Sequence, residues 1–388
     1  MQRIKGDLHL TDTQLGLLSG IAFAAFYSIL GIPLARWADR GNRVAIISLC
    51  ATLWSIMVSL CGAASSFWQL LVIRMGVAVG ESGCVPPANS LIADYFSRAQ
   101  RPRAMAIYML GPSLSMVIGY FAAGWLSELY GWRAMFVMLG LPGLLPAVLA
   151  GLTLREPRRA PGGVLHESAS AKPAKLTHIL PVLWSNPTFR HLLLFFSIVY
   201  FFGYGILQWQ PAFFIRSYGM STSAIGMWFA LIYGVGGMLG TFLGGELAAR
   251  FAANDEQRQL KTAALLYAAF APISAMIYVE HQLPISLALM GLSSFATAAT
   301  VGPLLATVQT LVPAHLRALS IAILYLFANL IGLGAGPLAA GALSDALRMT
   351  AGDESLRYAL LILSPGYLWG SWHLWRAGTS IERDLIAA

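Results

Sequence analysis

The sequence predicts an all-α polytopic membrane protein, and two observations carry that prediction. First, 57% of the 388 residues are hydrophobic and only 11% are charged, whereas soluble domains carry about a quarter charged residues. Second, the apolar residues fall in runs of about 20, the length that crosses a hydrocarbon core of roughly 30 Å as a helix. Such runs must be helical because the bilayer offers no water to backbone groups, and the alternating pattern of barrel strands is missing.

Eleven candidate spans follow one another along the chain. We place them at 14–35, 44–63, 67–93, 104–127, 133–153, 190–214, 222–248, 260–279, 284–311, 318–343 and 357–376. The first is not a removable signal peptide, because it follows mostly polar residues, is too long and lacks a small-residue cleavage site.

Lys and Arg gather in alternate loops, which predicts the orientation. They concentrate in the loop at 36–43, in the connection at 154–189 and near the C-terminus. Positive loops are retained in the cytoplasm, so we expect a multi-pass protein of the inner or plasma membrane with a cytoplasmic C-terminus. The net charge of +8 fits these retention signals and contact with anionic lipid, not nucleic-acid binding.

The two halves of the chain resemble each other. GIPLARWADRGNR at 31–43 aligns with GELAARFAANDEQR at 245–258, and RAMAI at 103–107 aligns with RALSI at 317–321, both at an offset of 214. A shared offset favours duplication of a unit of about six helices. We therefore expect an N-terminal bundle at 1–154, a cytoplasmic linker at 155–189 and a C-terminal bundle at 190–388. Five spans precede the linker and six follow it, so the first of twelve helices is expected to be missing.

Arg74 and Glu81 are ionisable residues well inside a predicted span. A central charge costs about 2.5 to 3.5 kcal/mol on insertion scales. Their spacing of seven places both on one helix face, about 10.5 Å apart along the axis. A carboxylate kept from water can exchange a proton, and a nearby arginine or substrate can control that exchange. We expect substrate binding and proton coupling here, with a structural ion pair as the alternative, and we expect Pro86 and Pro87 to bend the helix just after Glu81.

Long stretches of the chain carry a family resemblance. They are IKGDLHLTDTQLGLLSGIAFAAFYSILGIPLARWADRGNR at 4–43, RMGVAVGESGCVPPANSLIADYF at 74–96, YGWRAMFVMLGLPGLL at 130–145 and RALSIAILYLFANLIGLGAGPLAAGALSD at 317–345. These segments resemble the major facilitator superfamily and, within it, the spinster-like branch of sphingolipid and lysolipid transporters. The resemblance implies two pseudo-symmetric bundles, a central cavity and transport by alternating access. It also implies that Arg74 faces an anionic head group, that Glu81 takes part in coupling, and that an Asp of the first helix, without counterpart here, assists.

The loop after the first predicted span looks like the signature loop of that superfamily. Asp39, Arg40 and Arg43 would form a gating loop that pairs with charged groups or a helix N-terminus only when the cytoplasmic side is shut. The sequence departs from the usual pattern at Ala35 and Asn42, where glycine is usual. Plain topogenic charge is the alternative interpretation.

The span at 190–214 is rich in aromatic residues and amides. Candidates for lining the cavity are Tyr200, Tyr204, Gln208, Trp209 and Gln210. An aromatic wall with a few amides suits a lipid-like tail and head. Such a stripe more often faces lipid or neighbouring helices.

Several chemistries are not indicated. The three cysteines form no CxxC pair, the seven histidines form no HExxH motif, and no phosphate-binding GxxxxGK[ST] motif is present. We therefore expect no cofactor, no metal and no catalytic residues. The sequence predicts a monomeric secondary transporter that moves an amphipathic or anionic, lysolipid-like solute, with protons and membrane lipids as further partners. The alternatives are a truncated non-transporting remnant or binding protein and, more weakly, an integral-membrane enzyme.

Overall fold

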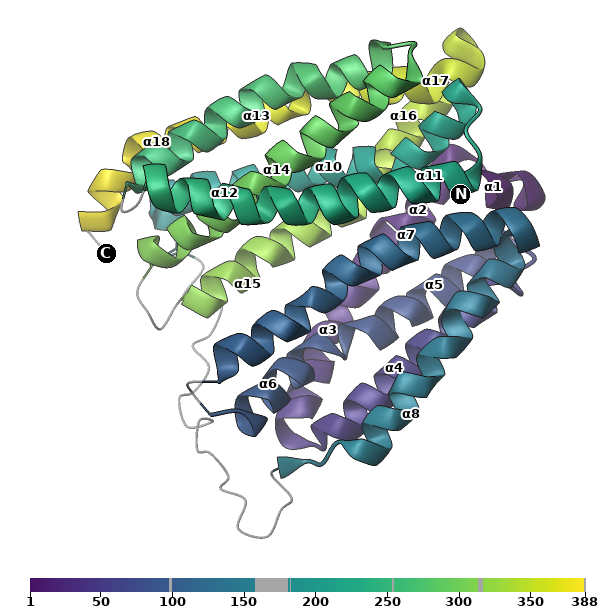
Figure 1. Cartoon of the computed structure of the whole chain (residues 1–388), viewed down its shortest axis with the longest axis horizontal. Coiled ribbons are helices and arrows are strands. Elements are labelled where there is room, and N and C mark those ends of the chain that lie inside the picture. Colours follow the sequence, from purple (N-terminus) through teal and green to yellow (C-terminus); the bar gives the residue numbers. More distant parts are fainter. Residues whose placement is uncertain (98–99, 158–180, 182, 253–254, 313–316, 387–388) are drawn as a thin grey trace. The chain divides into compact units, whose positions relative to one another are not determined.

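The computed structural model describes residues 1–97, 100–157, 181, 183–252, 255–312 and 317–386, and within these ranges every regular element is a helix (Figure 1). Contacts divide the chain into two units. Unit 1 comprises Met1–Leu10 and Ile21–Lys172, and unit 2 comprises Thr11–Gly20 and Pro173–Ala388. Most of the predicted linker at 155–189 lies outside the described residues.

Unit 1 contains seven α-helices and one 3₁₀ turn in its described part. They are α1 (Gln2–Leu8), α3 (Ile21–Arg40), α4 (Arg43–Cys61), α5 (Phe67–Ser82), α6 (Val85–Tyr95), α7 (Arg101–Gly140), the 3₁₀ turn η1 (Leu141–Gly143) and α8 (Leu144–Thr153). Helix α4 packs against α5, α7 and α8. Glycines allow these close contacts. A Cβ at Gly80 of α5 would lie 2.6 Å from the backbone nitrogen of Trp54 of α4, and a Cβ at Gly140 of α7 would lie 2.6 Å from the backbone nitrogen of Ser59 of α4.

Unit 2 contains the remaining helices of the described chain. They are α2 (Asp12–Ser19), α10 (Pro187–Tyr218), α11 (Thr222–Phe229), η3 (Ala230–Gly236), α12 (Gly237–Phe251), α13 (Glu256–Val279), α14 (Leu283–Leu311), α15 (Arg317–Phe327), η5 (Ala328–Ala335), α16 (Gly336–Ala351), η6 (Gly352–Glu354), α17 (Ser355–Leu363) and α18 (Gly366–Ile386). Segments η3 and η5 are π-helical. Such segments are rare and often occur at functional sites.

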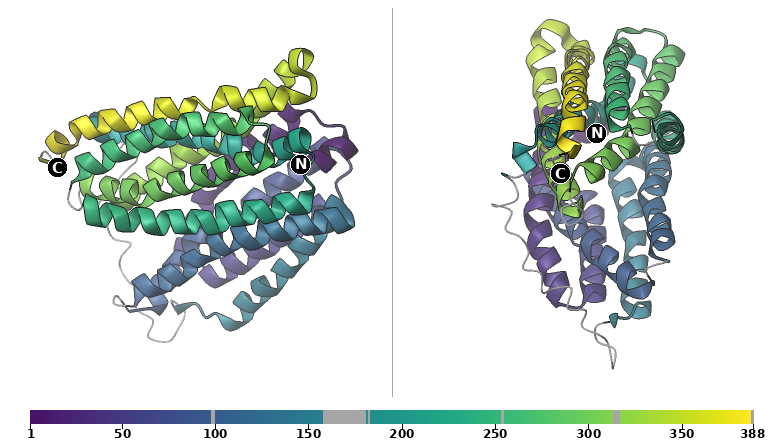
Figure 2. Two further views of the ribbon diagram at one scale, coloured as in Figure 1. Left: turned by 45° about the horizontal axis from the view of Figure 1, so that its top comes forward. Right: turned by 90° about the vertical axis from the view of Figure 1, so that its left-hand side faces the viewer.

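Helix α10 lies at the core of unit 2. It packs against α18, η5 and α16, and its buried side chains include Phe189, Phe195, Trp209 and Phe213. In both views of Figure 2 the yellow α18 runs along the green α13, which it also contacts extensively. Helix α16 approaches α10 backbone to backbone, since a Cβ at Gly205 would lie 2.9 Å from the carbonyl oxygen of Gly336.

The apolar stretches agree in position with the predicted spans. Nine stretches of the described chain are long and apolar enough to cross a membrane. Two of them, Arg103–Thr153 and Ser320–Leu385, each contain two predicted spans. Within the first, Gly131 adopts φ 80° and ψ 165°, a conformation that only glycine reaches readily, and this residue separates the two predicted spans. The number of crossings stays a prediction.

One predicted span is divided between the two units, and the predicted domain bounds stay a prediction. The predicted span 14–35 is interrupted at Gly20, which has φ −107° and ψ −107°. By contacts, Thr11–Gly20 belong to unit 2, whereas Met1–Leu10 and the residues from Ile21 onward belong to unit 1. Sequence repeats do not reveal this division, because it depends on which helix the short segment α2 packs against.

Candidate functional site

Arg74 and Glu81 lie on α5, close to a break in the helix. Helix α5 ends at Ser82 and α6 begins at Val85, so Pro86 and Pro87 occupy the first turn of α6. Proline is tolerated there because the first amides of a helix have no intrahelical acceptor. The helix is interrupted at Gly83 and Cys84, between Glu81 and the two prolines, and the bend itself stays a prediction.

The packing of α5 determines the direction of its charged face. Gly76, Gly80 and Gly83 are the close-contact positions: a Cβ at Gly76 would lie 2.7 Å from the Met57 sulfur of α4, and Gly80 and Gly83 are similarly tight against α4. At about 100° per residue, Arg74 and Glu81 lie on roughly the opposite side of α5 from this glycine face. Both charged residues therefore lie off the glycine face of α5, and Arg74 lies near enough to Cys61, the last residue of α4, to interact with it electrostatically.

Neither charged side chain on this face is fully buried. The Arg74 guanidinium lies 5.3 Å from the centre of the Phe23 ring of α3, a cation–π distance. Glu81 interacts electrostatically with Arg74, but among the described residues its carboxylate has no hydrogen-bond or ion-pair partner. The structure thus brings the two predicted residues onto one face without joining them in a salt bridge.

The predicted gating loop is described only at Arg43. Asp39 and Arg40 are the last residues of α3, and their side chains lie outside what the structure describes. Arg43 starts α4 and is fully buried. Asn42, an unusual residue at its position in the superfamily pattern, is the N-cap of α4, and its side chain accepts a hydrogen bond from Ala45 N.

Arg43 is surrounded by acidic and hydroxyl groups of unit 1. Its backbone nitrogen donates to Glu156 Oε2 over 2.7 Å, and its guanidinium also donates to the Glu156 carboxylate. Nη1 donates to Ser90 Oγ over 2.8 Å, and Nη2 lies 2.7 Å from Asp94 Oδ2. Sequence reasoning missed Glu156, which is 113 residues from Arg43; its only sequence signal was a lone acid in an arginine-rich stretch. A gating role for this loop stays a prediction.

The aromatic span separates into two faces on α10. Tyr200, Tyr204 and Gln208 recur every fourth residue and are half-buried, as expected for one stripe of a helix. Tyr200 lies with its ring centre 5.4 Å from that of Tyr204 and 6.3 Å from that of Tyr325 on α15. These residues form a partly accessible polar and aromatic face of unit 2.

Trp209 and Gln210 belong instead to the core. Trp209 is fully buried, and its Nε1 donates to the Pro337 carbonyl oxygen over 2.9 Å. Gln210 is 3% exposed, its Nε2 donates to the Tyr278 hydroxyl over 3.0 Å, and its Oε1 accepts from Tyr233. Their polar atoms are hydrogen-bonded inside unit 2, and a role in lining a cavity stays a prediction. Residue type cannot distinguish the two faces of α10; only packing does.

The described residues include no candidate metal site. No group of three or more His, Cys, Asp or Glu side chains is arranged to hold an ion there.

Known proteins resemble this chain over nearly its whole length. The Major Facilitator Superfamily model matches residues 1–337. An MFS-type efflux pump of Mycolicibacterium smegmatis is 32% identical over 387 residues, which cover 99% of this chain and 88% of that protein. Protein spinster homolog 1 of Xenopus tropicalis is 27% identical, over 98% of this chain and 76% of that protein.

A solved structure agrees with these relatives. The crystal structure of a bacterial homolog to the human lysosomal transporter Spinster, in an inward-facing and occupied conformation, matches with a TM-score of 0.85. The two sequences are 30% identical, and the match covers 99% of this chain and 92% of that one. Sequence and fold therefore give the same answer: the chain is a multi-pass integral membrane protein and a secondary transporter, not an enzyme, and it belongs to the Major Facilitator Superfamily, within which it is similar to the spinster proteins.

Proposed function

We propose that this transporter moves an amphipathic organic anion, lysolipid-like in character, and couples its movement to protons through Glu81. The observation that carries the proposal is the charged face of α5, where Arg74 and Glu81 lie on the side opposite the glycines that pack against α4. Keeping two charges inside a membrane span is costly, and such residues are usually functional.

The chemistry of the pair suits coupling. The Glu81 carboxylate has no hydrogen-bonding partner among the described residues, so its charge state depends on water, on the charge of Arg74 and on any bound anion. An anionic head group that binds Arg74 weakens the attraction between Arg74 and Glu81, and Glu81 then takes up a proton more easily. Binding of the anion and of the proton would thereby favour each other.

The half-buried face of α10 supports the amphipathic part of the proposal. Tyr200, Tyr204 and Gln208 combine aromatic rings with hydroxyl and amide groups. Rings of this kind contact acyl chains or flat apolar groups, while their polar ends remain hydrogen-bonded. We propose that this face contacts the solute in unit 2.

The named relatives support an exported solute and the spinster-like branch. One is called an efflux pump, and another is a spinster homolog; the lysolipid-like character of the solute rests on the resemblance to that branch. We propose that the chain acts as a monomer in the inner or plasma membrane, with its C-terminus in the cytoplasm, in line with the distribution of Lys and Arg in its loops.

The test is uptake into proteoliposomes that carry the purified protein. Lysophospholipid uptake is measured with and without an inwardly acidic or inwardly alkaline pH gradient. We expect the gradient to drive accumulation by the native chain, and we expect Glu81→Gln to lose the response to the gradient while it still exchanges solute at equal pH. Arg74→Gln should instead weaken binding of the anionic solute in both conditions.

A matched control is Glu246→Gln, which removes an exposed carboxylate of unit 2 and should leave gradient-driven uptake intact. Uptake by Glu81→Gln that still follows the pH gradient would contradict coupling through this residue. Absence of binding and of exchange by a well-folded native chain would favour the non-transporting remnant, whereas binding without exchange would favour a binding protein.

A further inference from the structure

A pair of histidines joins α10 and α18 at one end of unit 2. His191 lies in the first turns of α10, and His373 lies in the second half of α18. Their Nδ1 atoms are 2.9 Å apart, a hydrogen-bond distance. One of these nitrogens must carry the proton and the other must accept it. The half-buried His191 and the buried His373, which is 5% exposed, therefore fix each other's orientation.

Two arginines flank this histidine pair. Arg190 of α10 is half-buried, Arg376 of α18 is exposed, and both act electrostatically on His191. Among the described residues neither guanidinium forms an ion pair or a hydrogen bond. Two positive charges without a counter-ion create a potential that attracts an anion and repels a metal cation. The surroundings of His191 are therefore suited to an anionic ligand.

The acidic residues near the end of α18 do not neutralise these arginines. Asp384 is 6% exposed, and its carboxylate accepts from Thr188 N and Thr188 Oγ1 at 2.9 and 2.7 Å and pairs with Arg383. Glu382 is exposed, but at about 100° per residue it lies roughly 120° around α18 from Arg376. The excess of positive charge beside the histidine pair therefore remains.

Both arginines lie at the level expected for lipid head groups. Arg190 is the first residue of the predicted span 190–214, and Arg376 is the last residue of the predicted span 357–376. Because α10 and α18 pack against each other, the two guanidiniums come from neighbouring helices. Basic residues at the end of a span retain that end on one side of the membrane. That role does not require two of them to converge on one imidazole or to lack acidic partners.

Exposed tryptophans continue from the arginines along α18. Trp369 and Trp372 are 57% and 53% exposed, and at about 100° per residue they lie within roughly 40° of Arg376 around the helix. The Trp372 ring packs edge-on against His191, with the ring centres 5.9 Å apart. Indole rings favour the boundary between head groups and acyl chains. These rings are therefore placed to contact the glycerol region and the upper acyl chains of a lipid whose phosphate lies at the arginines.

The histidine pair can add a hydrogen-bond donor without adding charge. When His373 Nδ1 donates to His191 Nδ1, a neutral His191 carries its proton on Nε2. An anion beside His191 favours this arrangement, because Nε2 then donates to an oxygen of the anion. A zwitterionic lipid would instead bring its cationic amine to the same two arginines.

We propose that Arg190, His191, Trp372 and Arg376 form a binding site for the head group of an anionic phospholipid of the surrounding bilayer. At about 100° per residue, Tyr200 lies on the side of α10 opposite His191, so this site is separate from the face proposed to contact the solute. The inference does not depend on the identity of the solute or on proton coupling. Its tests measure lipid binding and are therefore independent of uptake.

The first experiment measures lipid binding directly. The delipidated full chain in detergent is titrated with phosphatidylglycerol or phosphatidylcholine, and bound lipid is counted by native mass spectrometry. We expect phosphatidylglycerol to bind more tightly. We expect Arg190→Gln with Arg376→Gln to weaken its first binding step about tenfold, as for two basic residues near an anionic surface. The variant should keep the native melting temperature, because neither guanidinium makes a contact within the described chain.

The charge-matched control is Arg250→Gln with Arg348→Gln, which removes two exposed arginines elsewhere in unit 2 and should bind phosphatidylglycerol as the native chain does. Unchanged affinity in the variant of Arg190 and Arg376 would overturn the proposal. Loss of binding in Arg74→Gln instead would place the lipid at the solute site and would also overturn it. Equally tight binding of inorganic phosphate would show a site for free anions and not for a lipid.

The second experiment locates the bound lipid. Brominated phosphatidylglycerol or brominated phosphatidylcholine is added to phosphatidylcholine bilayers that hold the protein, and bromine quenches indole emission at short range. The difference between the native chain and Trp372→Phe isolates the emission of Trp372. We expect the brominated phosphatidylglycerol to quench it more strongly, and we expect this preference to vanish with Arg190→Gln and Arg376→Gln. Trp68 of unit 1, 71% exposed and isolated in the same way with Trp68→Phe, is the control and should be quenched equally by both lipids. Equal quenching of Trp372 by the two lipids, or the same preference at Trp68, would contradict the site.

Discussion

Replacement of Arg43 by methionine should destabilise unit 1 severely. The Arg43 side chain is fully buried, and its nearest acid, Glu156, has a side chain that is 3% exposed. Methionine keeps much of the volume and removes the charge together with the hydrogen bonds to Glu156 and Ser90. The backbone hydrogen bond from Arg43 N to Glu156 remains available.

The expected loss follows from removing the guanidinium that faces a buried carboxylate. Removing one partner of a buried ion pair costs about 3 to 5 kcal/mol. Asp94 adds little to this figure, since its side chain is 34% exposed and can be rehydrated. The exposed ion pair of Arg250 with Glu246 should contribute far less to stability. Its side chains are 69% and 47% exposed, and exposed pairs one helical turn apart contribute about 0.3 to 0.5 kcal/mol.

The assay is thermal inactivation of the detergent-solubilised protein, followed as loss of the monodisperse peak after heating. Arg43→Met should lower the apparent Tm on the order of 10 °C, and Arg250→Met should leave it nearly unchanged. Arg43→Met combined with Glu156→Leu should recover much of the loss, because of the two acids that contact Arg43 only Asp94 then remains, and its side chain is 34% exposed. The reasoning is refuted if Arg43→Met costs no more than Arg250→Met, or if the double variant is as unstable as Arg43→Met alone.

Three further predictions concern other parts of the molecule. Gly336→Ala should destabilise unit 2 by about 1 to 3 kcal/mol, because the new Cβ would overlap the Phe201 backbone. The control is Gly119→Ala, which should be neutral or stabilising because nothing lies within 4 Å of its Cβ. Equal heating curves for the two variants would contradict the close contact at Gly336. Tyr204→Phe should raise the KM for a lysophospholipid severalfold with little change in the melting temperature, whereas an unchanged KM would remove Tyr204 from the solute site. A reporter enzyme that is active only in the cytoplasm should be active when it is fused to the C-terminus. Activity of a reporter that works only outside the cytoplasm, fused at the same place, would contradict the predicted orientation.

Much of this protein can be predicted from local sequence. The hydrophobic runs determine the helical class, because backbone groups in lipid have no other way to pair. The cost of charge in a membrane singles out Arg74 and Glu81, and the fixed φ and missing amide of Pro86 and Pro87 predict the break after Glu81. All of these depend on residues that are near one another in the chain.

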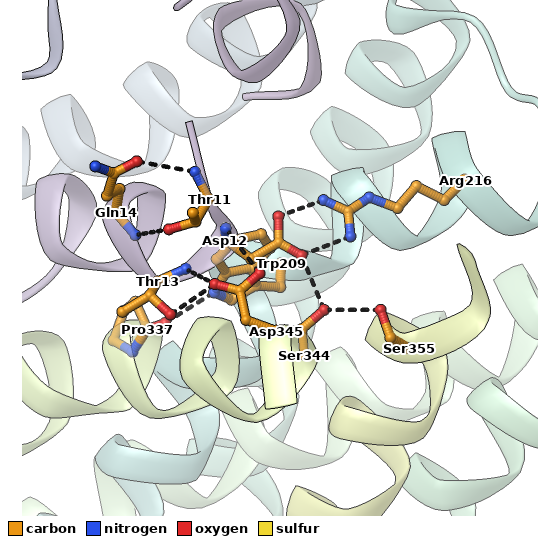
Figure 3. Close-up of polar contacts among 10 residues, drawn as sticks. All are labelled: Thr11, Asp12, Thr13, Gln14, Trp209, Arg216, Pro337, Ser344, Asp345 and Ser355. Carbon is orange, nitrogen blue, oxygen red and sulfur yellow. Dashed lines mark hydrogen bonds and ion pairs between the residues drawn. The ribbon is translucent and has the colours of Figure 1, made fainter. Parts of the chain in front are cut away.

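The remaining features depend on contacts between distant segments, which no local pattern encodes. Arg43 is paired with Glu156, which is 113 residues away in the chain, and not with a residue near it in sequence. On α10, the packing of the helix buries Trp209 and Gln210 and leaves Tyr200 accessible. The same holds for α2. Sequence alone makes it the beginning of an apolar span; tertiary structure assigns it to unit 2, because glycines there allow its backbone to approach α16 and because Asp345 of α16 lies where the first amides of α2 need an acceptor (Figure 3).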